Sequence, residues 1–498
     1  MIAQTDLVTP PVDWYAIAPE LALFGAGVLI VLVRSIFRHG RYVFESALAI
    51  AGVGLVVATA FSWVQWHIVR EDGPYQALAG MVAVDGFAVF IRLVVLAATA
   101  LTILISAAYL RREHLEGSEY VALVLLSATG MTLMASANDL VIVFLALEIL
   151  SIALYVLAAF DRRRTTSQEA GFKYFILGAF SSAVFLYGIA FVYGATGTTS
   201  LTGIADFLAR TTLLDSGALM IGLALLLVGL AFKVSAAPFH MWTPDVYQGA
   251  PTPVAAFAAA ATKAAAFAAL LRVFVGSFDL YRVDWRPAVY ALAVASLLVG
   301  SIAALRQTDV KRMLAYSSIS HAGYVLIGVQ AATADGTAAA LFYLLVYALM
   351  IMGAFAVITA VGRRGDDDHD LDDFRGLGVR EPLFAGLLTL FLLAQAGVPL
   401  TGGFVAKLAV FSAATDSGQY VLALVGMLSA AISAFVYLRI TLALYGTTDA
   451  SDAPRVGLDL ATGAALFAAA AAVVALGVLP GTALDFARDA TMLLAGAR

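Results

Sequence analysis

The sequence contains no cysteine and little charge. None of the 498 residues is a cysteine, which excludes disulfide bonds, thiolate-held iron–sulfur clusters and cysteine zinc sites in this chain. Charged residues make up only 13% of the chain, whereas a soluble protein carries roughly a quarter. The six histidines are scattered and show no recognisable metal-ligand spacing. The composition therefore excludes an ordinary soluble domain.

Long hydrophobic runs dominate instead. Hydrophobic residues account for 62% of the chain, and the mean hydropathy is +0.93. Because about 20 apolar residues cross a bilayer as a helix, the runs predict an all-α polytopic membrane protein. The start lacks the features of a signal peptide, so we expect the first helix to be retained. About fourteen spans are expected, near residues 15–33, 43–65, 82–107, 119–136, 139–159, 172–194, 217–237, 253–275, 287–305, 314–332, 337–361, 383–412, 419–445 and 459–480.

The loops predict the orientation in the membrane. Most loop arginines fall on one side, among them Arg34, Arg111 and Arg363, while the opposite side holds fewer, including Arg70 and Arg272. By the positive-inside rule the first loop is cytoplasmic, and both termini lie outside. No soluble domain fits between the spans. The longest hydrophilic insert, "GRRGDDDHDLDDFRGLGVREP", is interpreted as a solvated cytoplasmic loop.

Two predicted spans are interrupted by helix-breaking residues. The first is "LVGLAFKVSAAPFHMW", which contains Pro238, and the second is "LLAQAGVPLTGGFVAKLAVF", which contains Pro399, Gly402 and Gly403. Each break lies within six residues of a lysine. Interrupted helices at corresponding positions of two halves are typical of inverted-repeat transporters.

We therefore expect two inverted repeats of five helices, each with one broken helix. The expected divisions are helices 1–3 (1–117), a first antiporter-like repeat of helices 4–8 (118–278), a second repeat of helices 9–13 (279–446), and helix 14 with the tail (447–498).

Ionisable residues within the apolar spans are the strongest functional signal. Glu148 and Lys263 lie near the centres of their spans, and Lys233 and Lys407 lie beside the two breaks. A charge at the bilayer centre costs about 2.5–3.5 kcal/mol on insertion scales. The alternative to a functional role for Glu148 and Lys263 is a structural ion pair that holds two helices together. Lys233 is near enough to an end to snorkel, and Lys407 is also compatible with a structural cavity.

Other polar residues in the spans give weaker signals. His321 lies among serines and a tyrosine, which either order water or join helices by hydrogen bonds. His240 follows the first break and is compatible with capping freed carbonyls. Lys173 is interpreted as an interface anchor rather than a relay group. Arg92 and Arg439 are interpreted as structural.

Buried lysines are suited to proton transfer. Only five of the 29 basic residues are lysines, and three of the five lie inside apolar segments. Arginine stays charged, whereas a desolvated lysine can release its proton. A chain of lysines and ordered water, tuned by a carboxylate such as Glu148, would carry a proton through the bundle. The free carbonyls of broken helices would help to hold the water.

Several segments resemble the antiporter-like membrane subunits of respiratory complex I, the proton-pumping NADH:quinone oxidoreductase. They include "FLALEILSIALYVLAAF", "EAGFKYFILGAF", "PFHMWTPDVYQGAP", "QTDVKRMLAYSSISHAGY" and "GVPLTGGFVAKLAVF". The resemblance runs from about residue 119 to 415, and "PFHMWTPDVYQGAP" with Lys407 favours the subunit N type over the subunit M type.

The resemblance implies a role for each intramembrane charge. Glu148 matches the family's fifth-helix glutamate, Lys233 the lysine of the broken seventh helix, and Lys263 the central lysine of the eighth. Lys407 matches the ionisable residue of the broken twelfth helix. His240, His321 and Lys173 fall at matching positions with lesser roles expected.

The resemblance also implies the setting of the chain. It places the chain in a bacterial plasma (inner) membrane as a subunit of a proton-translocating enzyme, and the positive-inside rule then makes both termini periplasmic. Flavin, iron–sulfur clusters and quinone are expected in partner subunits, which include further antiporter-like subunits, with no cofactor in this chain and no nucleic-acid partner. A multi-subunit cation/proton antiporter and a non-transporting membrane scaffold remain the alternatives.

Overall fold

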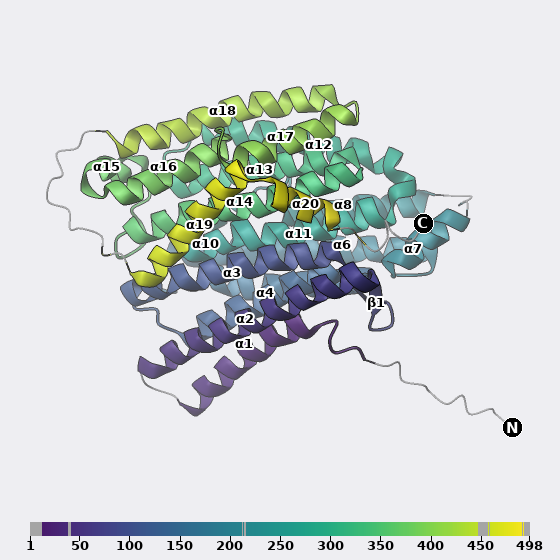
Figure 1. The fold of residues 1–498 in the computed structure, drawn as a ribbon, viewed down its shortest axis with the longest axis horizontal. Coiled ribbons are helices and arrows are strands. Elements are labelled where there is room, and N and C mark those ends of the chain that lie inside the picture. Colours follow the sequence, from purple (N-terminus) through teal and green to yellow (C-terminus); the bar gives the residue numbers. More distant parts are fainter. Residues whose placement is uncertain are drawn as a thin grey trace.

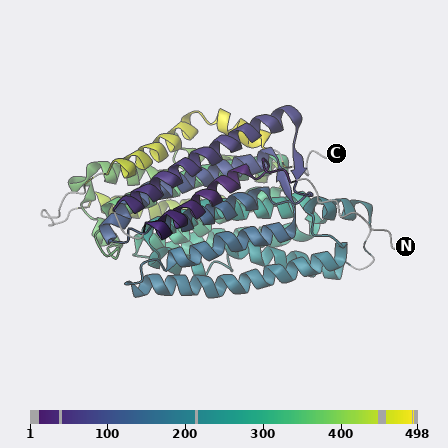
Figure 2. The same cartoon turned by 90° about the horizontal axis from the view of Figure 1, so that it is seen from below.

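The chain forms a bundle of long helices. The computed structural model describes residues 12–37, 41–211, 213, 216–446, 457, 459–490 and 492. Figure 1 shows α1 and α2 along one edge of the bundle and α18 along the other, and Figure 2 shows the long helices lying nearly parallel. Among the described residues, eleven helices are long and apolar enough to cross a membrane. The predicted all-α membrane fold is therefore confirmed.

The fourteen expected passes correspond to these eleven helices, to α13, and to the two broken helices α8–α9 and α16–α17. The helices are α1 (Ala18–Ile36), α2 (Arg41–Asp72), α3 (Gly86–Glu113), α4 (Ser118–Ser136), α5 (Leu140–Ala158), α6 (Thr165–Thr196), α7 (Leu201–Arg210), α8 (Gly217–Lys233), α9 (Trp242–Gly249), α10 (Thr252–Phe257), η1 (Ala258–Thr262), α11 (Lys263–Leu270), η2 (Leu271–Ser277), η3 (Asp279–Tyr281), α12 (Arg282–Ala304), α13 (Val310–Ala331), α14 (Ala334–Val361), η4 (Leu371–Phe374), α15 (Leu377–Arg380), α16 (Pro382–Ala396), α17 (Gly402–Asp416), α18 (Tyr420–Leu444), α19 (Leu460–Val478) and α20 (Gly481–Asp489).

Short elements between the passes are absent from the sequence prediction. They include the helices α7, η4 and α15 and an antiparallel pair of strands, β1 (Tyr75–Ala77) and β2 (Val82–Val84), and the short helix α20 follows the last pass. Each is too short to give a membrane-length apolar run, so the criterion that finds spans does not detect it.

The most deeply buried pass is the continuous helix α10–η1–α11–η2, from Thr252 to Ser277. Its apolar window is completely buried by the surrounding helices. The pass is rich in alanine, and small side chains allow neighbouring helices to approach closely. Two stretches of π-helix, η1 and η2, interrupt its regular turns. This central helix carries Lys263.

The first break separates α8 from α9. Lys233 is the last residue of α8, and Pro238 lies in the irregular segment before Trp242. Backbone groups freed by the break find partners within the fold. The Ala237 N–H donates to Ser296 Oγ at 2.8 Å, and Trp242 Nε1 donates to the Phe232 carbonyl at 3.0 Å. Such pairing makes irregular backbone tolerable inside a membrane protein.

The second break separates α16 from α17. Pro399 lies inside it, whereas Gly402 and Gly403 form the first turn of α17. The backbones pack so closely here that a Cβ on Gly403 would collide with the Ala394 carbonyl oxygen. Gly403 therefore permits the close approach of the two half-helices.

Candidate functional site

Lys233 is enclosed at the end of α8. Its Nζ atom donates to Ser151 Oγ at 2.8 Å and to the Tyr174 hydroxyl at 3.0 Å. It also lies 5.0 Å from the centre of the Tyr174 ring, a cation–π arrangement. The residue is only 3% exposed, so its ammonium group does not snorkel to the bundle surface. Helices α5 and α6 thus supply the partners of Lys233.

Glu148 lies on α5, three residues before Ser151. Its side chain is partly exposed on the bundle, and its Oε1 atom is buried with no hydrogen-bond partner among the described residues. No ion pair within 4.0 Å joins Glu148 to Lys233 in the described chain. The hydroxyl of Ser151, rather than the carboxylate, directly contacts the lysine.

Lys263 is the first residue of α11 and is 2% exposed. Its Nζ atom donates to the backbone carbonyl and the hydroxyl of Ser318 on α13. The same nitrogen lies 5.5 Å from the centre of the Tyr347 ring on α14. The central lysine is therefore held by a hydroxyl, a carbonyl and an aromatic face.

His321 joins α13 to two neighbouring helices. Its Nδ1 atom lies 2.8 Å from the Tyr343 hydroxyl, and its Nε2 atom lies 3.1 Å from the Tyr437 hydroxyl. Tyr437 in turn hydrogen bonds to Ser317, whose hydroxyl donates to Gln395 Oε1 at 3.4 Å. These contacts form a continuous hydrogen-bonded chain from His321 to the end of α16.

Lys407 contacts the backbone of Gln395, the residue whose side chain ends that chain. Its Nζ atom donates to the Gln395 carbonyl at 2.9 Å and to the Ala396 carbonyl at 2.7 Å. These carbonyls close α16, where the helix dipole favours a cation. The nitrogen also lies 5.0 Å from the centre of the Tyr324 ring. The second break thus leaves carbonyl oxygens without helical partners, and Lys407 donates hydrogen bonds to them.

The link between the two halves is less direct. Among the described residues, no hydrogen bond joins the Lys233 group to the Lys263 group. Aromatic rings occupy the intervening region: Tyr174 stacks on Trp242 with centroids 4.4 Å apart, and Trp242 meets Tyr247 at 6.3 Å. The Tyr247 hydroxyl is buried with no hydrogen-bond partner in the described chain. Buried polar atoms of this kind are sites where ordered water binds.

His240 and Lys173 lie apart from these contacts. His240 is partly exposed in the turn before α9, and its Nδ1 atom has no hydrogen-bond partner among the described residues. Lys173, with a 41% exposed side chain, forms ion pairs of 2.7 Å with Glu169 and with Asp245 on α9. The structure does not bring either residue into contact with the buried lysines.

The buried arginines make contacts of a different kind. Arg92 pairs with Glu20 at 2.8 Å, as expected of a structural residue. Arg272, which sequence analysis assigns to a loop, is instead fully buried in η2, and its Nη1 and Nη2 atoms donate to Asp85 at 2.8 and 2.9 Å. Counting Arg272 among the loop arginines was wrong, because the residue lies inside the predicted span 253–275, and η2 continues the buried pass beyond it to Ser277.

The principal partners of the lysines are also absent from the sequence prediction. Ser151, Tyr174 and Gln395, which contact the lysines, and Tyr437, which contacts His321, lie within apolar runs. A polar side chain inside such a run is the only local signal that marks them. No group of three or more histidine, aspartate or glutamate residues able to hold a metal occurs in the part of the chain that the structure describes.

Broken helices and buried lysines on neutral partners define the class: an antiporter-like membrane subunit. A family model described as NADH:quinone oxidoreductase/Mrp antiporter, transmembrane, matches residues 137–433. The chain belongs to this family, and the predicted resemblance is confirmed.

Individual relatives cover nearly the whole chain. NADH-quinone oxidoreductase subunit N 1 of Solibacter usitatus is 45% identical over 96% of this chain and 97% of its own. A chain of respiratory complex I from Thermus thermophilus, solved with bound aureothin, superimposes with a TM-score of 0.80 at 35% identity, over 95% of this chain and 100% of that one. A chain of the Mrp complex from Dietzia sp. gives a TM-score of 0.81 at 23% identity, over 96% of both, and shares the fold.

Proposed function

We propose that this chain is a proton-translocating membrane subunit of NADH:quinone oxidoreductase, of the subunit N type. The observation that carries the proposal is the burial of Lys233, Lys263 and Lys407 against hydroxyls, backbone carbonyls and aromatic rings, with no carboxylate within 4.0 Å among the described residues. A lysine in such a site has no fixed counter-charge, and its neutral partners accommodate both the protonated and the neutral amine. The near full-length similarity to proteins named subunit N supports the choice of complex.

In this proposal the proton passes along the buried lysines. Lys233 accepts or releases it under the influence of Glu148, and Lys263 carries it through the centre. The hydrogen-bonded chain from His321 to Gln395 leads it to Lys407. Tyrosine and serine hydroxyls donate and accept alternately, which suits short proton transfers. Pro238, Pro399, Gly402 and Gly403 shape the broken helices. His240 and Lys173 have lesser roles.

The relay is organised in two repeats within the membrane. We propose the division into helices 1–3, a first repeat over 118–278, a second over 279–446 and a terminal helix. The subunit lies in a bacterial inner membrane with both termini periplasmic. NADH and quinone react in partner subunits, which hold the flavin and iron–sulfur clusters, and the energy reaches this chain through its neighbours.

The multi-subunit cation/proton antiporter is the weaker alternative. The likeness to the Mrp complex is in fold, at 23% identity, against 45% for a named subunit N. Purification of the tagged chain from its native membrane separates the two. Co-purification of flavin and iron–sulfur absorbance supports the respiratory complex, and their absence favours the antiporter.

Lys263→Ala tests the relay. We expect the number of protons pumped per NADH oxidised to fall while the complex still assembles, because the central carrier is missing. The ratio is measured in inverted vesicles by a pH-sensitive dye alongside NADH absorbance. Arg306→Ala, which removes an exposed cation outside the membrane spans, is the control and is expected to keep the ratio. An unchanged ratio in Lys263→Ala contradicts the relay and leaves a membrane scaffold.

A further inference from the structure

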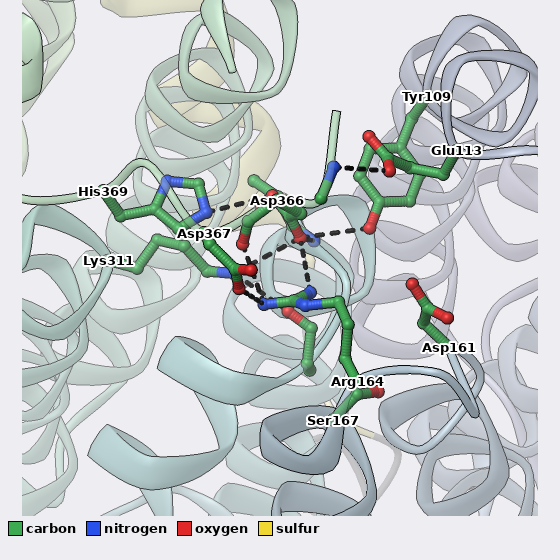
Figure 3. Close-up of polar contacts among 12 residues, drawn as sticks. Tyr109, Glu113, Asp161, Arg164, Ser167, Lys311, Asp366, Asp367 and His369 are labelled. Atoms are coloured by element: carbon green, nitrogen blue, oxygen red, sulfur yellow. Dashed lines mark hydrogen bonds and ion pairs between the residues drawn. The ribbon is translucent and has the colours of Figure 1, made fainter. Parts of the chain in front are cut away.

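The loop after α14 contains a buried carboxylate with many partners. Sequence analysis interprets this acidic insert as solvated, but Asp366 is 1% and His369 3% exposed. Asp366 accepts hydrogen bonds from Tyr109 at 3.0 Å, Arg164 at 3.1 Å and His369 at 3.0 Å. In Figure 3 these side chains converge on Asp366 from several elements. The charges that surround it, rather than solvent, explain how an aspartate can be buried there.

Two further contacts tie Asp366 to the starts of membrane helices. It accepts from the Thr252 N–H at 3.1 Å and from the Thr252 hydroxyl at 2.6 Å, at the first turn of α10. It also lies 3.7 Å from Lys311 Nζ in the first turn of α13, a lysine that donates to the Ala250 carbonyl at 2.9 Å. We call Asp366 with Tyr109, Arg164, Thr252, Lys311 and His369 the Asp366 clasp.

The clasp supplies the N-terminal capping hydrogen bond that α10 does not receive from its own N-cap residue. The residue before α10 is Pro251, and its side chain makes no capping hydrogen bond. Asp366 takes that place from another part of the chain, where a carboxylate also suits the helix dipole. Asp366 has a left-handed backbone with φ of 52°, a conformation that costs energy in a non-glycine residue. Its geometry is set by its surroundings rather than by its own preference.

The helices that meet at the clasp are those that hold the buried lysines. Arg164 is the N-cap residue of α6, which carries Tyr174, the partner of Lys233. Thr252 begins the pass that reaches Lys263 eleven residues later, about 16 Å along the helix.

On α13, Ser318 follows Lys311 by seven residues, or two turns, and so lies on the same helix face. Ser318 is the residue that binds Lys263. A shift of α10 against α13 at the clasp therefore changes the Lys263–Ser318 contact.

We propose that Asp366 is a positioning residue for the proton relay: it locks the starts of α6, α10 and α13 together and so keeps the buried lysines in register. The inference rests on the proposed relay function, because a register matters only if protons move between these side chains. Asp366 does not itself carry the proton. It couples the first repeat, through Arg164 and Thr252, to the second, through Lys311.

The test compares Asp366→Asn with Glu113→Gln in the assembled complex. Glu113 is buried, faces the same end of the bundle and accepts from the Gly365 N–H at 2.8 Å. It therefore holds the same loop without touching α6, α10 or α13 in the described contacts. Asp366→Asn is expected to lower protons pumped per NADH, by less than Lys263→Ala does. Glu113→Gln is expected to keep the ratio, and Asp366→Glu to restore part of it.

A double variant separates positioning from general damage. If Asp366 acts through Lys263, adding Asp366→Asn to Lys263→Ala lowers the ratio no further. A strictly additive fall overturns the proposal. Thr252→Val, which removes one hydroxyl bond from the clasp, is the second variant if Asp366→Asn fails to assemble. It is expected to lower the ratio slightly, and a wild-type ratio in every assembled clasp variant overturns the proposal.

A structural readout distinguishes failure of this inference from failure of the relay. Since this chain has no cysteine, Ala250→Cys introduces its single thiol beside the clasp, and labelling is read on this subunit after the subunits are separated by electrophoresis. Hydrogen bonds to charged groups are strong enough that Asp366→Asn is expected to raise its maleimide labelling rate about tenfold in the solubilised complex. If Lys263→Ala keeps the wild-type ratio, the relay itself is wrong, whatever the labelling shows. If Lys263→Ala lowers the ratio but Asp366→Asn leaves ratio and labelling unchanged, only the positioning role is wrong.

Discussion

Two kinds of buried cation lie inside this bundle, and their partners differ. Arg92 and Arg272 each lie against a carboxylate, at 2.8 Å in both cases. The ammonium groups of Lys233, Lys263 and Lys407 touch hydroxyls and backbone carbonyls, and no carboxylate lies within 4.0 Å of them among the described residues. All five side chains are nearly or fully buried.

The difference follows from the chemistry of the two side chains. An arginine cannot release its proton in a protein, so burying it demands a permanent counter-charge. A lysine can become neutral, and neutral partners allow both of its protonation states. The arginine pairs therefore hold the N-terminal helices and the central pass in place. The three lysines, unlike the buried Lys311 with the Asp366 carboxylate 3.7 Å away, have surroundings that suit the proposed proton carriers.

Replacing the buried cation itself should give the largest difference in stability between the arginine sites and the lysine sites. Arg272→Met leaves the Asp85 carboxylate buried without its cation, and we expect it to destabilise the chain by about 3–5 kcal/mol. Lys263→Met leaves no charge behind and is expected to cost about 1 kcal/mol, the value of a typical hydrogen bond. Thermal unfolding in detergent, with recovery of assembled complex, compares them. Equal losses of stability in the two variants would remove the distinction.

A charge-preserving change tests the lysines directly. Lys407→Arg keeps a cation near the Gln395 and Ala396 carbonyls but prevents release of the proton. We expect assembly to be retained and protons pumped per NADH to fall as far as in Lys407→Met. Vesicle acidification, normalised to NADH oxidation, gives the ratio. Wild-type pumping in Lys407→Arg would show that deprotonation of this residue is not required.

The smallest expected effect is the change in maleimide labelling at the clasp with pH. Burial alone raises the pKa of the Asp366 carboxyl, but the nearby Lys311 charge and the His369 hydrogen bond lower it by more. With the Arg164 charge added, the pKa lies below its usual value. A carboxyl with a lowered folded pKa contributes stability above its unfolded pKa of about 4, and that contribution is lost as pH falls through the folded pKa.

Between pH 8 and pH 5.5 the Asp366 contribution is therefore constant. We expect the labelling rate of Ala250→Cys to stay unchanged over this range when normalised to Val379→Cys, an 85% exposed reference on the same side of the bundle. The measurement is repeated in His369→Asn, since that imidazole also faces Asp366, as do Arg164 and Lys311. A rise in labelling on acidification in both backgrounds would show that Asp366 gains a proton in this pH range, contrary to this prediction.

The lysines could be identified from the sequence because a charge in an apolar run is energetically costly and therefore easy to recognise. Lys233, Lys263 and Lys407 needed no structure to be selected. The sequence did not identify Tyr437 or Gln395, because their contacts join residues that are far apart in the chain. His321 and Tyr437, for example, are 116 positions apart. Local pattern cannot show which helices become neighbours.

The acidic insert shows the same limit, because here the sequence predicted exposure for a residue that is buried. Its run of aspartates has the composition of a solvated loop, yet Asp366 lies 202 positions from Arg164 and 114 from Thr252, and both are its partners. The buried Arg272–Asp85 pair, 187 positions apart, was likewise invisible in the sequence.

The sequence by itself determined that this chain crosses a membrane many times, that two passes are broken, and that lysines lie within them. These features follow from the cost of placing charge and unpaired backbone in hydrocarbon, which each segment bears alone. Only the tertiary structure decided what each charge faces. Helix packing gave Arg272 a carboxylate, Lys263 a hydroxyl, Lys407 the end of another half-helix, and Asp366 the starts of three helices. Such partners depend on which distant segments pack together, and that choice is made by the bundle as a whole.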